Sequence, residues 1–323
     1  MYAGIDLGGR NVRAVVLDCK GGELTFVASA VARLSEATNC TDLFNGVVDR
    51  GCPIDEAEVA VVGAAGIFRE ETGVFERTPR YPYPISLPEL HRKFHWRLAY
   101  AINNFEADAY YLLSPQASRA RLLFGNPLPA GQAGNAVITG PGSGLGIADW
   151  LYQTHEQRVI LRSEAGHISF PLVDPERQWP LVEYLKETVG PNAIQIESIL
   201  SGPGLTRLHD FLHEETLSPE SVGERIRQGS SQAGKLFAYY LGLWLRAIAL
   251  WVLPRGGIYL TGEVLVNIPE LLEYPELREA MLFSTVHRAT IAAFPVFFVN
   301  NDYAGAWGAA MVAFRRDIQR HLV

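Results

Sequence analysis

Short apolar runs separated by glycine turns open the chain. The first run, Tyr2–Ile5, enters the turn Asp6-Leu7-Gly8-Gly9, and a second run leaves it from Val12 to Leu17. Another glycine pair, Gly21-Gly22, leads into a third run, Leu24–Ala30. Apolar runs of this length joined by tight turns are typical of antiparallel strands. The pattern therefore predicts a three-stranded meander at the start of the chain.

The same arrangement recurs in the middle of the chain. Asn135–Thr139 enters the turn Gly140–Gly146, and the runs Ile147–Tyr152 and Val159–Leu161 follow it. Backbone amides in such a turn can approach a phosphate because glycine has no Cβ. A single glycine turn is equally typical of two core strands that simply reverse direction. Two such halves facing each other would form a cleft with one phosphate-binding turn on each wall.

The remaining segments alternate between helical and strand patterns. Residues 41–50 have helical spacing, and Ser86-Leu87-Pro88-Glu89 has the sequence of a capped helix start. Four prolines between residues 77 and 88 predict an irregular loop, and residues 115–134, rich in Gly and Pro, predict a surface segment. Further strands are predicted at Val59–Val62, Arg97–Ile102, Gly256–Gly262 and Phe294–Val299, and further helices at Asn103–Leu113 and Tyr303–Leu322.

The most apolar segment is Leu236–Leu253, which Gly242 and Arg246 interrupt. Its length is at the lower edge of what a membrane-spanning helix needs. Because it stands alone between segments of ordinary composition, we interpret it as a buried core helix.

Composition narrows the class of protein. A length of 323 residues suits two domains, and 48% apolar with 20% charged residues is typical of a soluble globular protein. A net charge of −7 argues against nucleic acid and against an anionic membrane as partners, although not against a nucleotide. The three cysteines, Cys19, Cys40 and Cys52, have no metal-site spacing, and no signal peptide is predicted. We therefore expect reduced thiols and a cytoplasmic location.

Several motifs together resemble one family. Asp6-Leu7-Gly8-Gly9 with Asn11 and Arg13 is similar to the first phosphate motif of bacterial glucokinases, and Gly142-Ser143-Gly144-Leu145-Gly146 to the second. Gly256–Gly262 stands where that family has its adenosine motif. Ser163–His167 resembles the family's Glu-x-x-His sugar-binding motif, and Ile196–Leu205 resembles a segment nearly diagnostic of it. The resemblance extends over nearly the whole chain.

The resemblance implies a fold and an activity. The expected fold is the two-domain α/β fold of actin-like ATPases (ribonuclease H-like) with a central cleft. Residues 1–112 with 306–323 would form the small domain, and residues 113–305 the large one. The expected activity is ATP-dependent transfer of a phosphoryl group to the 6-hydroxyl of glucose or a related hexose, with Mg²⁺ as cofactor. A homodimer is the expected assembly.

The resemblance also implies roles for individual residues. The sugar-binding positions are Asn103, Glu164, His167 and Glu197, whose carboxylate, imidazole and amide groups suit sugar hydroxyls. Asp6 is the expected Mg²⁺ ligand, since carboxylate oxygens suit this ion. The nucleotide-binding positions are Asp6, Gly8, Gly9, Arg10, Asn11, Gly142, Ser143, Gly144 and Gly262.

One departure concerns the proton acceptor. The family has Asn-Asp-Phe where this chain has Asn103-Asn104-Phe105, and the Asp is the general base that takes the proton from the sugar hydroxyl. The Asn104 amide can hold a hydroxyl but cannot accept its proton, and a general base is worth about 10²–10⁴-fold in rate. Glu106 or Asp108 could stand in for the missing base. Positioning carries much of phosphoryl transfer, so activity can persist without the base.

Other departures leave the sugar and the activity open. Arg10 replaces a Thr of the first phosphate motif, and Glu263 replaces a Gly beside the adenosine motif. The loop Arg80-Tyr81-Pro82-Tyr83 replaces an Asn-x-Thr-Trp stretch near the sugar, so the identity of the hexose stays open. An alternative is a catalytically impaired homologue that binds sugar or nucleotide. A DNA-binding repressor is disfavoured, since the sequence has no helix-turn-helix segment before Met1 and is acidic.

Overall fold

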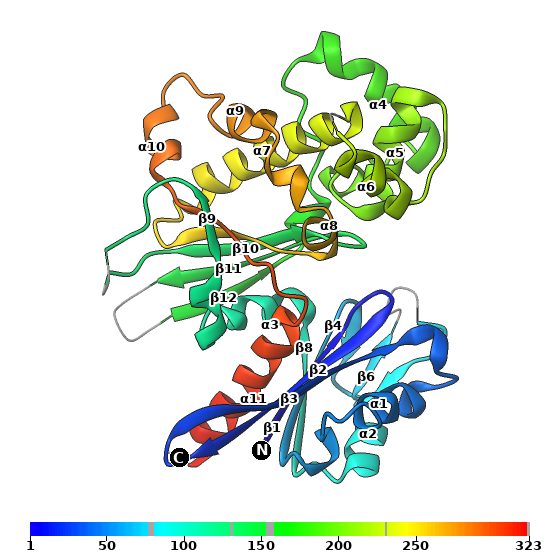
Figure 1. The fold of residues 1–323 in the computed structure, drawn as a ribbon, viewed down its shortest axis with the longest axis vertical. Coiled ribbons are helices and arrows are strands. Elements are labelled where there is room, and N and C mark those ends of the chain that lie inside the picture. Colours follow the sequence, from blue (N-terminus) through cyan, green and yellow to red (C-terminus); the bar gives the residue numbers. More distant parts are fainter. Residues whose placement is uncertain (77–80, 130–131, 153–157, 230, 322–323) are drawn as a thin grey trace. The chain divides into compact units, whose positions relative to one another are not determined.

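The computed structural model describes residues 1–76, 81–129, 132–152, 158–229 and 231–321. The chain divides into two compact units (Figure 1). Unit 1 is Met1–Arg119 with Asp302–Val323, and unit 2 is Ala120–Asn301. Each unit is built on a mixed sheet that begins with a meander, so the mixed α/β organisation predicted from the sequence is confirmed.

The sheet of unit 1 has the strand order β3-β2-β1-β4-β8. β1 pairs antiparallel with β2 and parallel with β4, and β4 pairs parallel with β8. A small separate sheet has the order β5-β6-β7. The strands are β1 (Tyr2–Leu7), β2 (Asn11–Lys20), β3 (Glu23–Arg33), β4 (Val59–Ala64), β5 (Ile67–Arg69), β6 (Val74–Glu76), β7 (Ile85–Ser86) and β8 (Leu98–Asn103).

Four helices flank this sheet: α1 (Cys40–Val48), α2 (Leu87–Phe94), α3 (Asn104–Tyr111) and α11 (Ala304–His321). The C-terminal helix α11 packs on β1 and beside α3, as Figure 1 shows. Near the C-terminal end of α11, the Tyr2 hydroxyl donates to the Asp317 carboxylate at 3.0 Å, and the Tyr2 ring packs edge to face against the Phe314 ring. The last helix of the chain thus completes the unit that the first strand begins.

The sheet of unit 2 has the order β12-β11-β10-β13-β14-β9. β10 pairs antiparallel with β11 and parallel with β13, so its first five strands repeat the order of the unit 1 sheet. The strands are β9 (Arg121–Phe124), β10 (Ala136–Pro141), β11 (Leu145–Tyr152), β12 (Arg158–Ser163), β13 (Gly257–Leu260) and β14 (Val296–Phe298). β9 lies inside the segment 115–134 that was predicted to be a surface segment, where no strand was predicted: Arg121–Phe124 extend the sheet as an antiparallel edge strand.

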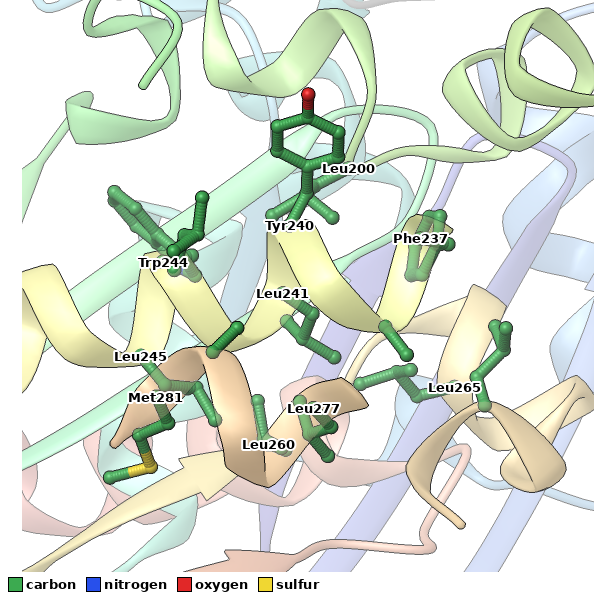
Figure 2. Packing of buried hydrophobic residues seen from close by; sticks show 14 of the residues in the cluster. Leu200, Phe237, Tyr240, Leu241, Trp244, Leu245, Leu260, Leu265, Leu277 and Met281 are labelled. Carbon is green, nitrogen blue, oxygen red and sulfur yellow. The ribbon is translucent and has the colours of Figure 1, made fainter. Parts of the chain in front are cut away.

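The helices of unit 2 include α7 (Gln232–Val252), many of whose residues belong to the larger hydrophobic core. Figure 2 shows Phe237, Leu241 and Leu245 of this helix among leucines of neighbouring elements. The Trp244 indole N–H donates to the Thr139 hydroxyl on β10 at 3.0 Å, which joins helix and sheet. The other helices are α4 (Pro175–Val189), α5 (Gly202–His213), α6 (Pro219–Arg227), α8 (Glu263–Asn267), α9 (Pro275–Met281) and α10 (Arg288–Ala293).

Among the described residues, α7 alone is long and apolar enough to cross a membrane, but 61% of its most apolar window is buried inside the protein. This burial supports the interpretation of Leu236–Leu253 as a core helix.

Candidate active site

The first glycine turn joins β1 to β2 and carries a pair of opposite charges at its base. Asp6 and Arg13 are direct cross-strand partners. The Gly8 N–H donates to the Asn11 carbonyl at 3.0 Å, which closes the turn, so this amide is already used within the protein. Arg10 is exposed at the tip of the turn.

Asp6 lies against the first turn of α11. A Cβ added to Gly305 would lie 2.9 Å from the Asp6 carboxyl carbon, so a larger residue here would displace the Asp6 side chain. Burial raises the pKa of Asp6 to about 6, although the Arg13 guanidinium opposes the shift. Arg13 also lies 3.9 Å from the Asp302 carboxylate. A buried carboxylate that has lost its water is stabilised strongly by a nearby cation, which is what a metal-binding carboxylate requires.

A tyrosine side chain closes over the same turn. The Tyr81 hydroxyl donates to the Gly8 carbonyl at 2.9 Å. Burial first, and then the Asp6 carboxylate, raise the pKa of Tyr81 far above its ordinary value, so the hydroxyl keeps its proton for this bond. Tyr81 belongs to the loop that replaces the family's Asn-x-Thr-Trp stretch; Arg80 of that loop lies outside the described residues.

Asn103 and Asn104 stand at the start of α3. The Asn103 side-chain oxygen accepts the backbone N–H of Phe105 at 2.8 Å and that of Glu106 at 3.4 Å, so it caps the helix. Its side-chain NH₂ group is then the part suited to a sugar hydroxyl. Asn104 is the first helical residue, and its Cα would lie 3.8 Å from a Cβ built on Gly63 of β4.

Asp108 lies one helical turn beyond Asn104 and interacts electrostatically with Asp6. Burial and the Asp6 carboxylate raise the pKa of Asp108 well above its ordinary value, while Arg13 lowers it. A carboxyl group that resists ionisation is poorly prepared to accept a proton at neutral pH. The hypothesis that Asp108 or Glu106 replaces the missing base stays a prediction.

The second glycine turn, between β10 and β11, is bonded on two sides. The Gly142 N–H donates to the Gly144 carbonyl at 2.8 Å, and the Gly142 carbonyl accepts the N–H of Gly202, the first residue of α5, at 2.8 Å. The Ser201 hydroxyl caps α5 by accepting the Gly204 N–H at 3.0 Å. The positive end of a twelve-residue helix therefore lies at this turn, where it favours an anion.

Glu197 connects the second turn to the predicted sugar-binding residues. Its Oε2 atom accepts the Leu145 N–H at 2.8 Å, and a Cβ added to Gly144 would lie 2.4 Å from the same oxygen. The other oxygen, Oε1, lies 3.8 Å from Nδ1 of His167. Glycine at position 144 thus makes room for the carboxylate of Glu197.

Glu164 and His167 are carried by the turn that follows β12. His167 ends the short 3₁₀ helix Ala165–His167, and its Nε2 lies 3.9 Å from the Glu164 carboxylate. The exposed fraction falls along the set, from 79% for the Glu164 side chain through 49% for His167 to 29% for Glu197. Unit 2 therefore brings three of the four predicted sugar-binding side chains into one cluster, open to solvent at the Glu164 end.

The predicted adenosine motif lies at the end of β13. Gly262 has φ of 97° and precedes Glu263, the first residue of α8. The Thr261 N–H donates to the Thr139 carbonyl at 3.0 Å, so this segment lies beside the strand that enters the second turn. Both predicted nucleotide-binding segments of unit 2 thus end neighbouring parallel strands, the place where ligands bind in open α/β sheets.

The structure groups the predicted residues by unit. Asp6, Gly8, Gly9, Arg10, Asn11, Asn103 and Asn104 belong to unit 1, and Gly142, Ser143, Gly144, Glu164, His167, Glu197 and Gly262 to unit 2. Sequence reasoning missed two contacts: Tyr81 with Gly8, and the Gln195 side chain, whose Oε1 lies 2.7 Å from Nδ1 of His167. The position of Gln195, directly before the near-diagnostic segment Ile196–Leu205, was the available signal.

The described residues contain no group of three or more His, Cys, Asp or Glu side chains that could hold a metal ion by themselves. The predicted Mg²⁺ ligand, Asp6, would contribute a single carboxylate. This fits the usual mode of Mg²⁺, which takes one or two carboxylates and completes its shell with substrate phosphates and water.

Comparisons with known proteins agree with this organisation. The family model for glucokinase matches residues 4–316. A glucokinase of Caulobacter vibrioides is 29% identical over 283 residues, which cover 85% of this chain and 83% of that protein. A glucokinase of Xanthomonas euvesicatoria is 27% identical over 335 aligned positions, covering 98% and 95% of the two chains.

Solved structures share the fold. The glucokinase of Balamuthia mandrillaris in complex with glucose superposes with a TM-score of 0.78 at 24% identity, covering 97% of this chain and 93% of that one. A glucokinase from Streptomyces griseus in complex with glucose and AMPPNP gives a TM-score of 0.65 at 18% identity, covering 97% and 99%. The predicted actin-like ATPase fold is thereby confirmed. Because the family model spans almost the entire chain, the protein belongs to the glucokinase family of ATP-dependent hexose kinases.

Proposed function

We propose that the protein transfers the γ-phosphoryl group of ATP to the 6-hydroxyl of glucose or a closely related hexose. The observation that carries this proposal is the position of Glu197. One of its oxygens accepts the Leu145 N–H at the second glycine turn, and the other lies 3.8 Å from His167 in the cluster of predicted sugar-binding residues. One carboxylate thus connects the predicted phosphate-binding turn to the cluster of predicted sugar-binding residues.

The sugar would be held by hydrogen-bond acceptors. The carboxylates of Glu164 and Glu197 accept hydroxyl protons in charge-assisted bonds, and the exposed face of His167 adds a ring nitrogen. Asn103 would add its side-chain NH₂ group, because its oxygen is occupied by the helix cap. A set dominated by acceptors favours a polyol over a ligand that is itself an anion.

The glycine turn of each unit would bind nucleotide phosphates. In the second turn, the amides of Ser143 and Gly144 lie between two amides that are bonded within the protein, and the N-terminus of α5 adds a favourable field. In the first turn, Gly9 and Asn11 would contribute beside Arg10, a cation at the tip. Asp6 would hold Mg²⁺, which neutralises phosphate charge when it is bound.

Asn104 affects the rate that we expect. Its amide would hold and orient the 6-hydroxyl without accepting the proton, so catalysis would depend on positioning and charge neutralisation. The alternative, a homologue that binds sugar but turns it over poorly or not at all, depends on this substitution. Family membership does not favour it over a working hexose kinase.

Two coupled assays on the purified protein test the proposal. Release of ADP is followed with a panel of hexoses, and glucose 6-phosphate is detected separately through its dehydrogenase. We expect ADP release with at least one hexose, and signal in both assays when glucose is the acceptor. Hexose binding by calorimetry without ADP release would favour the impaired homologue, and absence of both would contradict the proposal.

Assembly and location complete the proposal. We expect a cytoplasmic homodimer, as the resemblance suggests. The three cysteines are free thiols, and burial raises the pKa of Cys40 and of Cys52 to about 12, which keeps both unreactive. Sedimentation velocity at micromolar concentration tests the assembly: a single species at the monomer mass would contradict the dimer.

A further inference from the structure

Of the contacts that the His167 imidazole makes with Gln195, Glu197 and Glu164, the shortest is with the amide rather than with a carboxylate. Nδ1 of His167 lies 2.7 Å from Oε1 of Gln195, compared with 3.8 Å to Glu197 and 3.9 Å from Nε2 to Glu164. Only the first distance is that of a hydrogen bond. Gln195 is therefore the residue that fixes the orientation of the ring.

Backbone bonds tie down the chain around this contact. Gln195 forms an isolated antiparallel bridge with Ser169, and the Ile196 N–H donates to the Ile168 carbonyl at 3.0 Å. The Gln195 N–H donates to the Ser198 hydroxyl at 3.1 Å. These bonds use backbone groups of Gln195 and Ile196, so they persist when the Gln195 side chain is replaced. The same side chain also takes part in a capping box with Ser198 at the start of the 3₁₀ helix Ile196–Ser198, so a variant at this position loses that cap together with the contact to His167.

The contact determines which ring nitrogen carries a proton. An amide oxygen only accepts, so Nδ1 of His167 must donate. In the neutral ring, Nε2 then carries the lone pair and accepts hydrogen bonds. Nε2 and the carboxylates of Glu164 and Glu197 form three acceptors in one cluster, which matches the adjacent hydroxyl donors of a hexose.

We infer that Gln195 is a positioning residue of the hexose site: it holds His167 in the Nδ1–H tautomer and presents Nε2 as an acceptor to a sugar hydroxyl. The inference rests on the proposed function for the identity of the ligand. It predicts that loss of the Gln195 amide weakens the binding of hexose and leaves the binding of nucleotide unchanged.

The kinetic test uses Gln195→Met, which keeps the length of the side chain and removes the amide. We expect the KM for hexose to rise about 3- to 10-fold, as for the loss of one neutral hydrogen bond. The kcat and the KM for ATP should stay within about twofold, because one bond to the ground-state sugar is removed. Gln228→Met, at an exposed glutamine directly after α6, is the matched control and should change neither constant.

The spectroscopic test needs no catalytic activity. Long-range ¹H–¹⁵N spectra of the uniformly ¹⁵N-labelled full-length protein distinguish the two histidine tautomers, and His167→Gln identifies the signals of His167 by their loss. We expect the Nδ1–H form in the wild type and a mixture of both forms in Gln195→Met. Gln195→Glu retains an acceptor beside Nδ1 and should keep the Nδ1–H form.

Two results would overturn the inference: an unchanged hexose KM in a folded Gln195→Met protein, or an Nε2–H tautomer in the wild type. A purely structural role for Gln195 predicts a lower melting temperature with the hexose KM unchanged. If the wild type phosphorylates no hexose, calorimetric hexose affinities of the same variants replace the KM values. If it also binds no hexose, the proposed function and this inference fail together, whereas binding with an unaltered affinity in Gln195→Met refutes the inference alone.

Discussion

The two glycine turns have the same position in two sheets of the same strand order, yet they differ in the residue pair at their base. In unit 1 this pair is Asp6 and Arg13, and in unit 2 it is Gly140 and Gly146. The first turn therefore has fixed charges next to it. The second has none at this pair and uses the N-terminus of α5 and the carboxylate of Glu197 instead.

This difference suggests that the two units, although they share one architecture, have different roles in binding substrates. The first turn has the buried carboxylate of Asp6, the predicted Mg²⁺ ligand, and the Tyr81 hydroxyl bonds to its backbone. The second turn is bonded directly to Glu197 of the predicted sugar-binding cluster. We therefore expect substitutions near the first turn to affect nucleotide or catalysis alone, and substitutions near the second to affect both substrates.

The largest effect is expected from Asn104→Asp on α3 of unit 1. The change introduces a carboxylate that can accept the proton of the 6-hydroxyl, a contribution of about 10²–10⁴-fold. We expect kcat to rise by at least about tenfold with the hexose KM little changed, measured in the coupled ADP assay. Asn104→Gln, which retains an amide, is the control and should give no gain. An unchanged kcat in Asn104→Asp would show that another group already accepts the proton.

The next effect concerns the connection between the second turn and the sugar cluster. Glu197→Gln removes the charge from both contacts of Glu197. Charge-assisted hydrogen bonds, worth about 1.5–3 kcal/mol, then become neutral hydrogen bonds, worth about 0.5–1.5 kcal/mol. We expect the hexose KM to rise about 5- to 15-fold and the KM for ATP to rise as well, since the Leu145 N–H at the predicted phosphate turn is one of the partners.

Glu164→Gln provides the comparison for Glu197→Gln. Its carboxylate is 79% exposed and has no bond to the glycine turn among the described residues, so a smaller increase in the hexose KM and an unchanged KM for ATP are expected. Equal effects of the two variants on ATP would contradict the division between the turns.

The strands that leave the two turns also differ at one buried position. The last residue pair before the first turn is Leu7 with Val12, and before the second turn it is Pro141 with Leu145. Four residues after Val12 lies Val16 of β2, and four residues after Leu145 lies Asp149 of β11, so these two positions correspond. Both side chains are buried, at 0% and 1% exposure. Burial raises the pKa of Asp149 to about 6, and its Oδ1 atom has no hydrogen-bond partner within the described part of the chain.

Asp149 predicts how stability depends on pH. Its folded-state pKa of about 6 lies above the ordinary value of 3.8, so between these values the folded state binds more protons than the unfolded state. The contribution of Asp149 to the free energy of unfolding is therefore lost as pH rises from about 4 through 6, by about 1.4 kcal/mol for each pH unit of the shift. We expect Asp149→Asn to flatten this dependence in urea titrations between pH 4.5 and 7.5. Parallel pH profiles of variant and wild type would refute the assignment.

The sequence predicted the architecture well because the architecture depends on repeated local signals. Both meanders, the buried helix α7 and the grouping of Glu164 with His167 follow from apolar runs, glycine turns and a family motif. β9 was missed because Arg121–Phe124 is short and Leu122 is 42% exposed, so the strand depends on pairing with β14 rather than on its own composition.

The side-chain contacts of the site were harder to predict. Asn103 was predicted to bind sugar, but a sequence does not reveal that its oxygen is committed to capping α3. Gln195 and Tyr81 are reached only through tertiary structure: a backbone bridge places the first beside His167, and an irregular loop places the second over Gly8. Residues of these types have many possible partners, and only the fold selects one.

The smallest effect tests the first turn by itself. Tyr81→Phe removes the hydroxyl that donates to the Gly8 carbonyl at 2.9 Å and leaves the ring in place. Loss of one neutral hydrogen bond is worth about 0.5–1.5 kcal/mol, and a less fixed turn presents its amides less well. We expect the KM for ATP to rise about 2- to 10-fold, with the hexose KM unchanged, in initial-rate measurements that vary each substrate in turn.

Tyr83→Phe is the matched control for Tyr81→Phe. The two rings meet edge to face with centroids 6.2 Å apart, and the buried Tyr83 hydroxyl has no hydrogen-bond partner among the described residues. Its removal should leave both KM values unchanged, so a difference between the two variants isolates the bond to Gly8. If Tyr81→Phe instead raised the hexose KM, the loop that carries it would belong to the sugar site, as the stretch it replaces does in the family, and the first turn would no longer act on the nucleotide alone.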